Sequence, residues 1–206
     1  MHNKNSAHTT IYRNIRYPRL ELKTGTLTLI LPNEYTKKDE LLRKHKDWIK
    51  QKQQTIQNAL QQAKTTRLNQ TRTPQQLEII INKTVQQTQT ELDTTIQRTF
   101  YRTMKTKWAS LSKNRNLTVN TLTRHLPESL IQYIIYHELT HAKHGKKHNQ
   151  TFWSQITSKF PNHQTLENNL LAHWFQIQQT QTKQHGFGTL KGMKPFTKND
   201  ELDTHD

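Results

Sequence analysis

Two histidines and a glutamate form the sequence feature with the clearest chemical meaning. His137-Glu138-Leu139-Thr140-His141 is an H-E-x-x-H motif, and histidines four positions apart on a helix lie on one face, one turn apart. Their imidazoles can bind one zinc ion at the roughly 2.0–2.1 Å that zinc–nitrogen bonds require. Glu138 is turned far enough from this face to reach a water on the metal without replacing a ligand, so we predict that it acts as general base.

A third ligand is needed, and two further histidines follow closely. On a continuous helix His144 would lie about 10 Å along the axis from His137, too far for both to bind one ion. Gly145 is a natural helix stop in the left-handed conformation, after which the chain can turn and bring His148 back. We predict that His137, His141 and His148 bind Zn²⁺ and leave a fourth position for water, as in catalytic zinc sites. The alternative is a structural histidine pair on a core helix.

Hydrolysis by activated water would also need a group that stabilises the oxyanion. Tyr136, His163 and His173 are candidates, and each also fits a structural role. Peptide hydrolysis is the favoured reaction, while hydrolysis of other amides or esters stays open. The rival interpretation is a basic nucleic-acid-binding module with a structural or degenerate zinc site. An intact Glu138 favours the enzyme, because a structural site needs no base beside its ligands.

The composition limits the other classes of site and the location of the protein. The 206 residues contain no cysteine and 12 histidines, which excludes disulfides, thiol nucleophiles and cysteine-bound metals and leaves imidazole and carboxylate as ligands. No apolar run approaches the length of about 18 residues that a membrane-spanning helix needs. The polar start lacks the apolar stretch of a signal peptide. We expect a cytoplasmic protein without membrane contact.

The charge points to a polyanionic partner. Lys and Arg number 31 against 15 Asp and Glu, for a net charge of +16, and such a field attracts nucleic acid. The run from Arg98 to Arg124 contains seven basic residues and no acidic one. This run predicts non-specific, salt-sensitive nucleic-acid binding. The competing explanation is solubilising charge in a protein from a lysine-rich proteome.

Periodicity predicts the elements that surround the motif. Alternation from Arg19 to Leu31 around Thr24-Gly25 indicates a β-hairpin. A helix is expected from Thr36, as N-cap, to about Ala63. The Gln/Thr-rich stretch that follows is interpreted as a solvated helical hairpin with a break at 67–73, or as a partly disordered linker. Short strands are expected at 99–101, 107–110 and 117–120.

The motif itself falls on a helix with clear limits. Pro127 is expected at its first position and Gly145 just beyond its end. A short helix at 151–160 should follow. The last helix opens at Pro161-Asn162 and carries a single apolar stripe, made of Leu166, Leu170, Trp174 and Ile177.

Taken together, these segments closely resemble the YgjP-like metallopeptidases, small zinc-dependent hydrolases related to the SprT and WLM proteases. The resemblance extends over about Ile11 to Lys159, interrupted by the Gln/Thr-rich segment. The stretches that carry it are Trp108-Ala109-Ser110, Asn116-Leu117-Thr118-Val119-Asn120, Leu126-Pro127, the H-E-L-T-H motif, and His148 followed by Phe152-Trp153.

The resemblance implies an α+β fold, a minimal zincin-like metalloprotease domain in which a small antiparallel sheet packs on the H-E-x-x-H helix. It implies that His137, His141 and His148 hold the metal, that Glu138 is the base and that the substrate is a protein or peptide. In related proteases the strand beside the metal can pair with substrate backbone. We expect a flexible N-terminus at 1–10, the domain at 11–185 with a helical insertion at 64–98, and a flexible tail at 186–206.

The sequence departs from the family pattern at several points. Ala109 stands where the family has glycine, and Leu111 stands where it has cysteine. The gap from His141 to His148 is one residue longer than in the family. The cysteine zinc ribbon of SprT proteins is absent. The first two changes predict an altered backbone approach of the strand beside the metal, and the last weakens any transfer of the DNA-linked role of SprT proteins.

Overall fold

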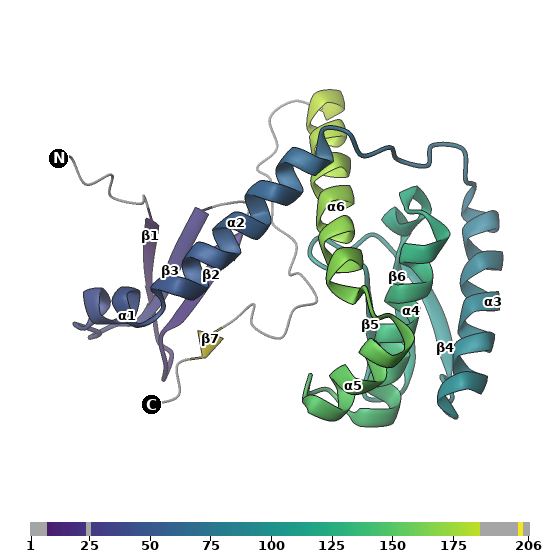
Figure 1. Ribbon diagram of the computed structural model, residues 1–206, viewed down its shortest axis with the longest axis horizontal. Coiled ribbons are helices and arrows are strands. Elements are labelled where there is room, and N and C mark those ends of the chain that lie inside the picture. Colours follow the sequence, from purple (N-terminus) through teal and green to yellow (C-terminus); the bar gives the residue numbers. More distant parts are fainter. Residues whose placement is uncertain (1–7, 24–25, 186–201, 204–206) are drawn as a thin grey trace.

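Two small β-sheets and the helices packed on them make up the fold in the computed structural model (Figure 1). The structure describes residues 8–23, 26–185 and 202–203. The first sheet has the order β1-β3-β2-β7. The bounds of its strands are β1 (His8–Arg13), β2 (Arg19–Lys23), β3 (Thr26–Pro32) and β7 (Leu202–Asp203).

The antiparallel pairing of β2 with β3 confirms the predicted hairpin, and β1 adds in parallel to β3. Of the N-terminal segment 1–10, residues 8–10 belong to β1 and residues 1–7 lie outside the described residues. The predicted flexible tail also lies outside them, except for 202–203, which pair with β2. Inward-facing leucines of β2 and β3, among them Leu20 and Leu29, are fully buried.

The predicted helix at 36–63 is two helices, α1 (Lys38–Lys44) and α2 (Lys46–Ala63). His45 leaves helical geometry at φ −107° and ψ 17°, which separates them. The cap position is Lys37, without a side-chain hydrogen bond, so the prediction of Thr36 as N-cap is wrong. Helix α2 runs from the first sheet to α6 (His163–His185), against which it packs (Figure 1).

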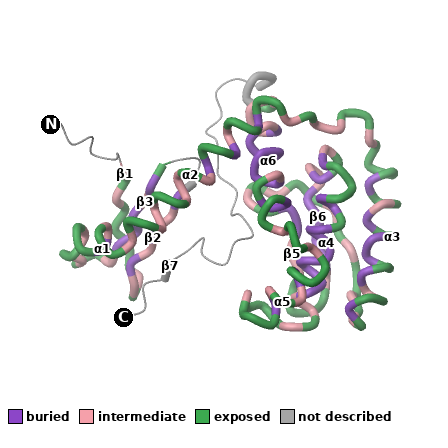
Figure 2. Tube along the Cα trace, in the orientation of Figure 1, coloured by how far each residue is buried: buried purple, intermediate pink, exposed green. Residues whose placement is uncertain are grey.

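Helix α3 (Pro74–Leu92) forms from the Gln/Thr-rich segment and begins with a full capping box between Thr73 and Gln76. The predicted break at 67–73 is confirmed. The prediction of a solvated helical hairpin is wrong, because α3 is partly buried. One side of α3 is buried (Figure 2), through Leu77, Ile81, Val85 and Leu92. This side packs on α4 (Glu128–His144), so the segment belongs to the core.

The second sheet consists of β4 (Arg98–Arg102), β5 (Ala109–Leu111) and β6 (Asn116–Asn120) in the order β4-β6-β5. The three strands confirm the sequence prediction. Strand β5 is antiparallel to β6, whereas β4 runs parallel to it. The expected α+β class is therefore confirmed. The expectation of an antiparallel sheet beside the motif helix is wrong for β4, whose parallel pairing with β6 makes this sheet mixed.

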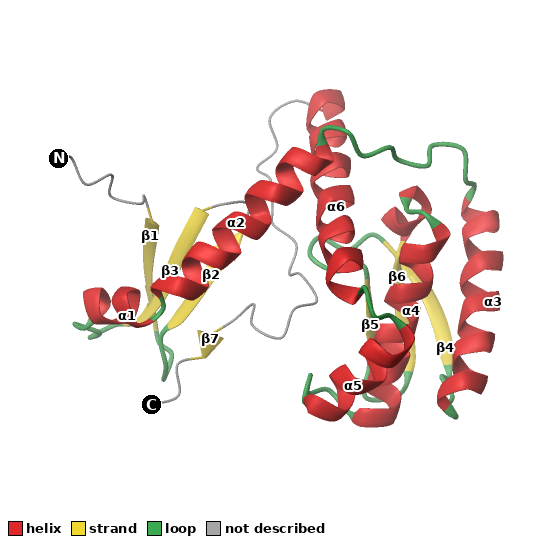
Figure 3. Cartoon of the chain, viewed as in Figure 1, coloured by secondary structure: helices red, strands yellow, loops and turns green. Residues whose placement is uncertain are grey.

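Helices complete the core around α4 (Figure 3). A short 3-10 helix, η1 (Thr121–His125), leads into α4, and α5 (Gln150–Lys159) and α6 follow it. The predicted stripe of Leu166, Leu170, Trp174 and Ile177 on α6 is buried. Trp174 packs edge-on against Trp108 at a ring distance of 5.1 Å, which joins α6 to the start of β5. No described helix has an apolar stretch long enough to cross a lipid bilayer.

Candidate active site

The motif histidines and glutamate lie on α4, a helix that is largely buried. Helix α4 is buried at every position from 133 to 140, and the exposed fractions of His137 and Glu138 are 1% and 6%. The helix ends at Gly145 as predicted, but with φ 79° and ψ −174° instead of the left-handed helical conformation. This region is open to glycine and strained for other residues. The turn it makes leads the chain directly towards His148.

Three histidines converge at the end of α4. The Nε2 atoms of His137 and His148 are 3.1 Å apart, and one ring nitrogen from each of His137, His141 and His148 lies within 4.8 Å of the others. The Nδ1–H of His141 donates to the carbonyl oxygen of Gly145 at 2.9 Å, which leaves the Nε2 lone pair for a ligand bond. His144 is not part of this cluster. The structure thus brings together the three predicted ligands.

Phe152 holds the returning chain against the helix. Its side chain is fully buried, and its ring centroid lies 5.0, 4.6 and 4.7 Å from those of His137, His141 and His148. The side chain of Asn149 caps α5 by accepting from the Phe152 N–H at 3.0 Å. These contacts therefore hold His148 in place after the segment that follows His141, which is one residue longer than in the family.

The surroundings of the three imidazoles keep them neutral. Burial lowers the pKa of His137 well below its ordinary value, and His141 and His148 lower it further. Burial, then the charge of His141, lowers the pKa of His148 to about 4. Burial also lowers the pKa of His141. Three neutral imidazoles present lone pairs at short range, a donor set that fits zinc or another divalent transition metal.

Glu138 lies beside this cluster and is attached to the second sheet. Its Oε2 accepts a hydrogen bond from the backbone N–H of Leu111 in β5 at 2.9 Å. Burial raises the pKa of Glu138 to about 7, against the opposing effects of this hydrogen bond and of Lys107. The contact uses the backbone of residue 111, so the leucine that replaces the family's cysteine can keep it.

Asn120 is a positioning residue that sequence reasoning missed. It is fully buried, and its Nδ2 donates to the carbonyl oxygens of Met104 and Lys107 at 2.9 and 2.7 Å. Its Oδ1 accepts from the Leu122 N–H at 3.1 Å. These bonds hold the connection that leads into β5. The one available signal was an amide side chain at the end of a strand that contains Leu117 and Val119.

A hydrogen-bonded pair that was also not predicted from the sequence joins the motif helix to α6. Tyr133, one turn before His137, donates from its hydroxyl to Glu167 Oε1 at 2.8 Å. Burial raises the pKa of Tyr133, as do the charge of Glu167 and this hydrogen bond. The Tyr133 and His137 rings are 6.1 Å apart. The pair therefore fixes one side of the histidine cluster to the last helix.

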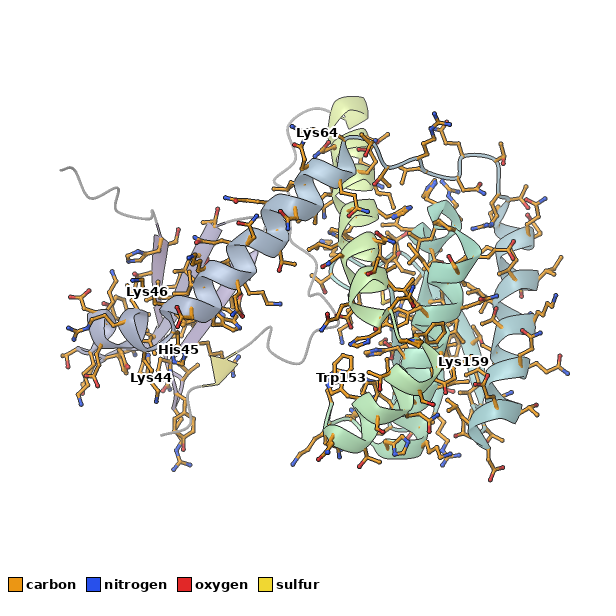
Figure 4. All side chains as sticks on the ribbon, in the orientation of Figure 1. Lys44, His45, Lys46, Lys64, Trp153 and Lys159 are labelled. Carbon is orange, nitrogen blue, oxygen red and sulfur yellow. The ribbon has the colours of Figure 1, made fainter. Side chains whose placement is uncertain are left out.

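The three candidates for oxyanion stabilisation have other partners. The hydroxyl of Tyr136 accepts from Gln155 Nε2 at 2.8 Å, and His173 Nδ1 donates to the carbonyl of Asn169 at 2.7 Å. His163 packs on Trp153 at a ring distance of 5.5 Å. Trp153, labelled in Figure 4, in turn packs on His148 at 5.7 Å. The ring of Trp153 thus lies between His163 and the histidine cluster.

A cavity of about 800 Å³ adjoins the cluster at Trp153. It lies between α2, α5 and α6, and its walls include Trp48, Trp153, His163 and Glu167. Since Trp153 also contacts His137 and His148, the cavity and the cluster share one aromatic wall. None of the three histidines lines the cavity, which meets the cluster only through Trp153.

An α+β fold with an H-E-x-x-H helix, a third histidine and a strand bound to the motif glutamate defines a metallopeptidase-type site. The family model described as "YgjP-like, metallopeptidase domain" matches residues 60–173, more than half of the chain, and the chain belongs to this family. The resemblance inferred from the sequence is confirmed. The uncharacterized protein MJ1213 of Methanocaldococcus jannaschii is 34% identical over 70 residues, which are 33% of this chain and 64% of that protein.

Two solved structures show local similarity. The metallopeptidase zymogen of Pyrococcus abyssi abylysin is 23% identical, with a TM-score of 0.41 over 44% of this chain and 91% of that chain. The metallopeptidase zymogen of Methanocaldococcus jannaschii jannalysin is 28% identical, with a TM-score of 0.40 over 48% of this chain and 88% of that chain.

Proposed function

We propose that the protein is a zinc-dependent peptidase in which His137, His141 and His148 hold the metal and Glu138 is the general base. The observation that carries the proposal is the position of Glu138, a buried carboxylate beside three neutral imidazoles. A purely structural metal site needs no such base, which argues against the binding module with a structural or degenerate site.

The residues of the chain suggest how such a reaction proceeds. A zinc ion bound by the three histidines would polarise the substrate carbonyl and make a water more acidic. Glu138 accepts the proton of the attacking water, for which its raised pKa makes it a stronger base than an exposed carboxylate. It then delivers that proton to the leaving amine. The hydrogen bond from Leu111 holds the carboxylate in place through both transfers.

We also propose that the catalytic unit extends over 11–185, as expected from the sequence, with 64–98 as its helical insertion. Support comes from α2 and α6, which pack along each other and so connect the first sheet to the motif region. Helix α3, from within 64–98, covers α4 directly.

Nucleic-acid binding is a second proposal, and one specific observation favours it. Arg98, Phe100 and Arg102 alternate along β4 and are all exposed, and the exposed fraction of Phe100 is 46%. An exposed aromatic ring between two cations can stack on a base while the arginines contact phosphates. The partner would be single-stranded nucleic acid bound without regard to sequence.

The test of the peptidase proposal is turnover of a broad library of quenched fluorescent peptides. The protein should cleave some of them, lose activity with a chelator and regain it on addition of zinc. A fully zinc-loaded protein that cleaves no member of the library would contradict the proposal.

A further inference from the structure

The rim of the histidine cluster carries positive charge from two directions. Lys107 stands just before β5, and Lys146 lies in the turn between His141 and His148. Both side chains are exposed. The strand that follows Lys107 bonds to Glu138 through the Leu111 N–H, and the residue before Lys146 bonds to His141 through its carbonyl, so both lysines lie on segments that contact the site. The charge of Lys107 also lowers the pKa of Glu138 and His141.

Apart from the motif residue Glu138, the segments around the rim contain no carboxylate. The two segments that build the strand and the loop around the cluster, 94–127 and 139–166, contain no Asp or Glu. Neither Lys107 nor Lys146 forms a salt bridge with another residue that the structure describes. The two acids nearest to the cluster in the sequence are Glu138, which is buried, and Glu128, which lies at the opposite end of α4.

Backbone hydrogen bonds fix the points from which both lysine side chains extend. The carbonyl of Lys107 accepts from the buried Asn120 side chain at 2.7 Å. Lys146 follows Gly145, whose carbonyl accepts from His141 at 2.9 Å. A substrate bound between the edge of β5 and this turn would lie between the two lysines.

We propose that Lys107 and Lys146 form a cationic rim that selects peptides with Asp or Glu close to the bond to be cleaved. The inference rests on the proposed peptidase function and adds its substrate class. Charge complementarity of this kind acts on encounter and discrimination more than on the chemical step. The preference should therefore appear mainly in KM, and it should weaken as salt screens the exposed charges.

The test compares the zinc-loaded protein on matched fluorescent peptides that differ only in Glu, Gln or Lys at positions flanking the cleaved bond. We expect kcat/KM to be about 5- to 10-fold higher for the Glu peptide than for its Gln twin at about 50 mM salt, with a smaller ratio at about 500 mM. The double variant Lys107→Glu, Lys146→Glu should prefer the Lys peptide. The control Lys37→Glu, Lys113→Glu changes the same charge at exposed positions outside the rim and should keep the original ratio.

Binding of the same peptides to zinc-loaded Glu138→Gln, measured by fluorescence anisotropy, separates the two proposals. Absence of cleavage contradicts the peptidase function, while the order of binding affinities decides the rim. Equal kcat/KM and equal affinity for the three peptides would overturn the rim, as would an equal effect of the control variant. A rim variant that loses binding of a short oligonucleotide but keeps the peptide preference would also overturn it.

Discussion

The backbone N–H of Leu111 donates to Glu138 Oε2 at 2.9 Å, and this bond joins the proposed base to the edge strand β5. Backbone groups on either side of Leu111 point to β6 instead. The carbonyl of Trp108 accepts from the N–H of Asn120, and the N–H of Ser112 donates to the carbonyl of Asn116. The free edge of β5 therefore faces Glu138. A change in the path of β5 must move the base relative to the histidine cluster.

The raised pKa of Glu138 predicts how stability depends on pH in the metal-free protein. The pKa rises from 4.5 to about 7 on folding, so the folded state holds this proton more strongly and its contribution to stability is lost as pH rises through that range. Glutamine does not ionise, so the Glu138→Gln variant does not lose this stability as the pH rises. The variant should gain up to about 3 kcal/mol over wild type between pH 4.5 and 7, at about 1.4 kcal/mol per pKa unit.

Urea denaturation in the presence of a chelator at several pH values measures this difference. The exposed Glu40 supplies a matched control as Glu40→Gln. A constant gap between Glu138→Gln and wild type across the range would show that burial does not raise the pKa of Glu138.

Asn120→Ala should destabilise the protein and displace β5. The substitution removes three hydrogen bonds of a fully buried amide, at roughly 1 kcal/mol each, and leaves buried partners unsatisfied. We expect a loss of roughly 3 kcal/mol in the free energy of unfolding and a lower kcat, with zinc content unchanged. The exposed Asn114, changed to Ala, is the control. Wild-type stability of Asn120→Ala would refute its role in holding the strand.

His148→Ala should lower zinc affinity severely, whereas His144→Ala should change it little. Only His148 belongs to the cluster with His137 and His141, and loss of one of three protein ligands leaves too few for tight binding. Competition with a chromogenic zinc chelator gives both affinities. If His144→Ala released the metal and His148→Ala kept it, the assignment of the third ligand would be wrong.

Phe100→Ala should weaken binding of single-stranded oligonucleotides about tenfold, because stacking of a base on an aromatic ring contributes about 1–3 kcal/mol. Arg98→Ala with Arg102→Ala should instead reduce the dependence of affinity on salt concentration. Fluorescence anisotropy with homopolymeric DNA and RNA measures both. Ile79→Ala, at another exposed apolar position, is the control, and equal loss in all variants would argue against the β4 surface.

The motif helix and its third histidine could be predicted because each follows from local geometry. His137 and His141 share a helical face at any site in any fold, and the stop at Gly145 limits where His148 can lie. The fold class followed from periodicity and from the family resemblance. These inferences need no knowledge of distant contacts.

Features that depend on tertiary contacts could not be predicted. The bond between Leu111 and Glu138 uses a backbone group, so no side chain signals it. The parallel pairing of β4 with β6 depends on how the intervening chain crosses, which alternation does not determine. In α3 the apolar stripe is weak among many Gln and Thr residues, and its burial could not be predicted because it depends on the packing of α4 beside it. Lys159 of α5, labelled in Figure 4, adds an ion pair to Glu91 of α3 at 2.7 Å.

The most direct test of the account is the activity of Glu138→Gln at full zinc occupancy. Glutamine keeps the size of the side chain and an oxygen that can accept from Leu111, but it cannot take a proton. We predict one zinc per chain in both proteins and a fall in kcat/KM of at least about 100-fold on the best library peptide, the usual scale for loss of a general base. Wild-type turnover by zinc-loaded Glu138→Gln would contradict the central claim that this carboxylate is the base of a peptidase.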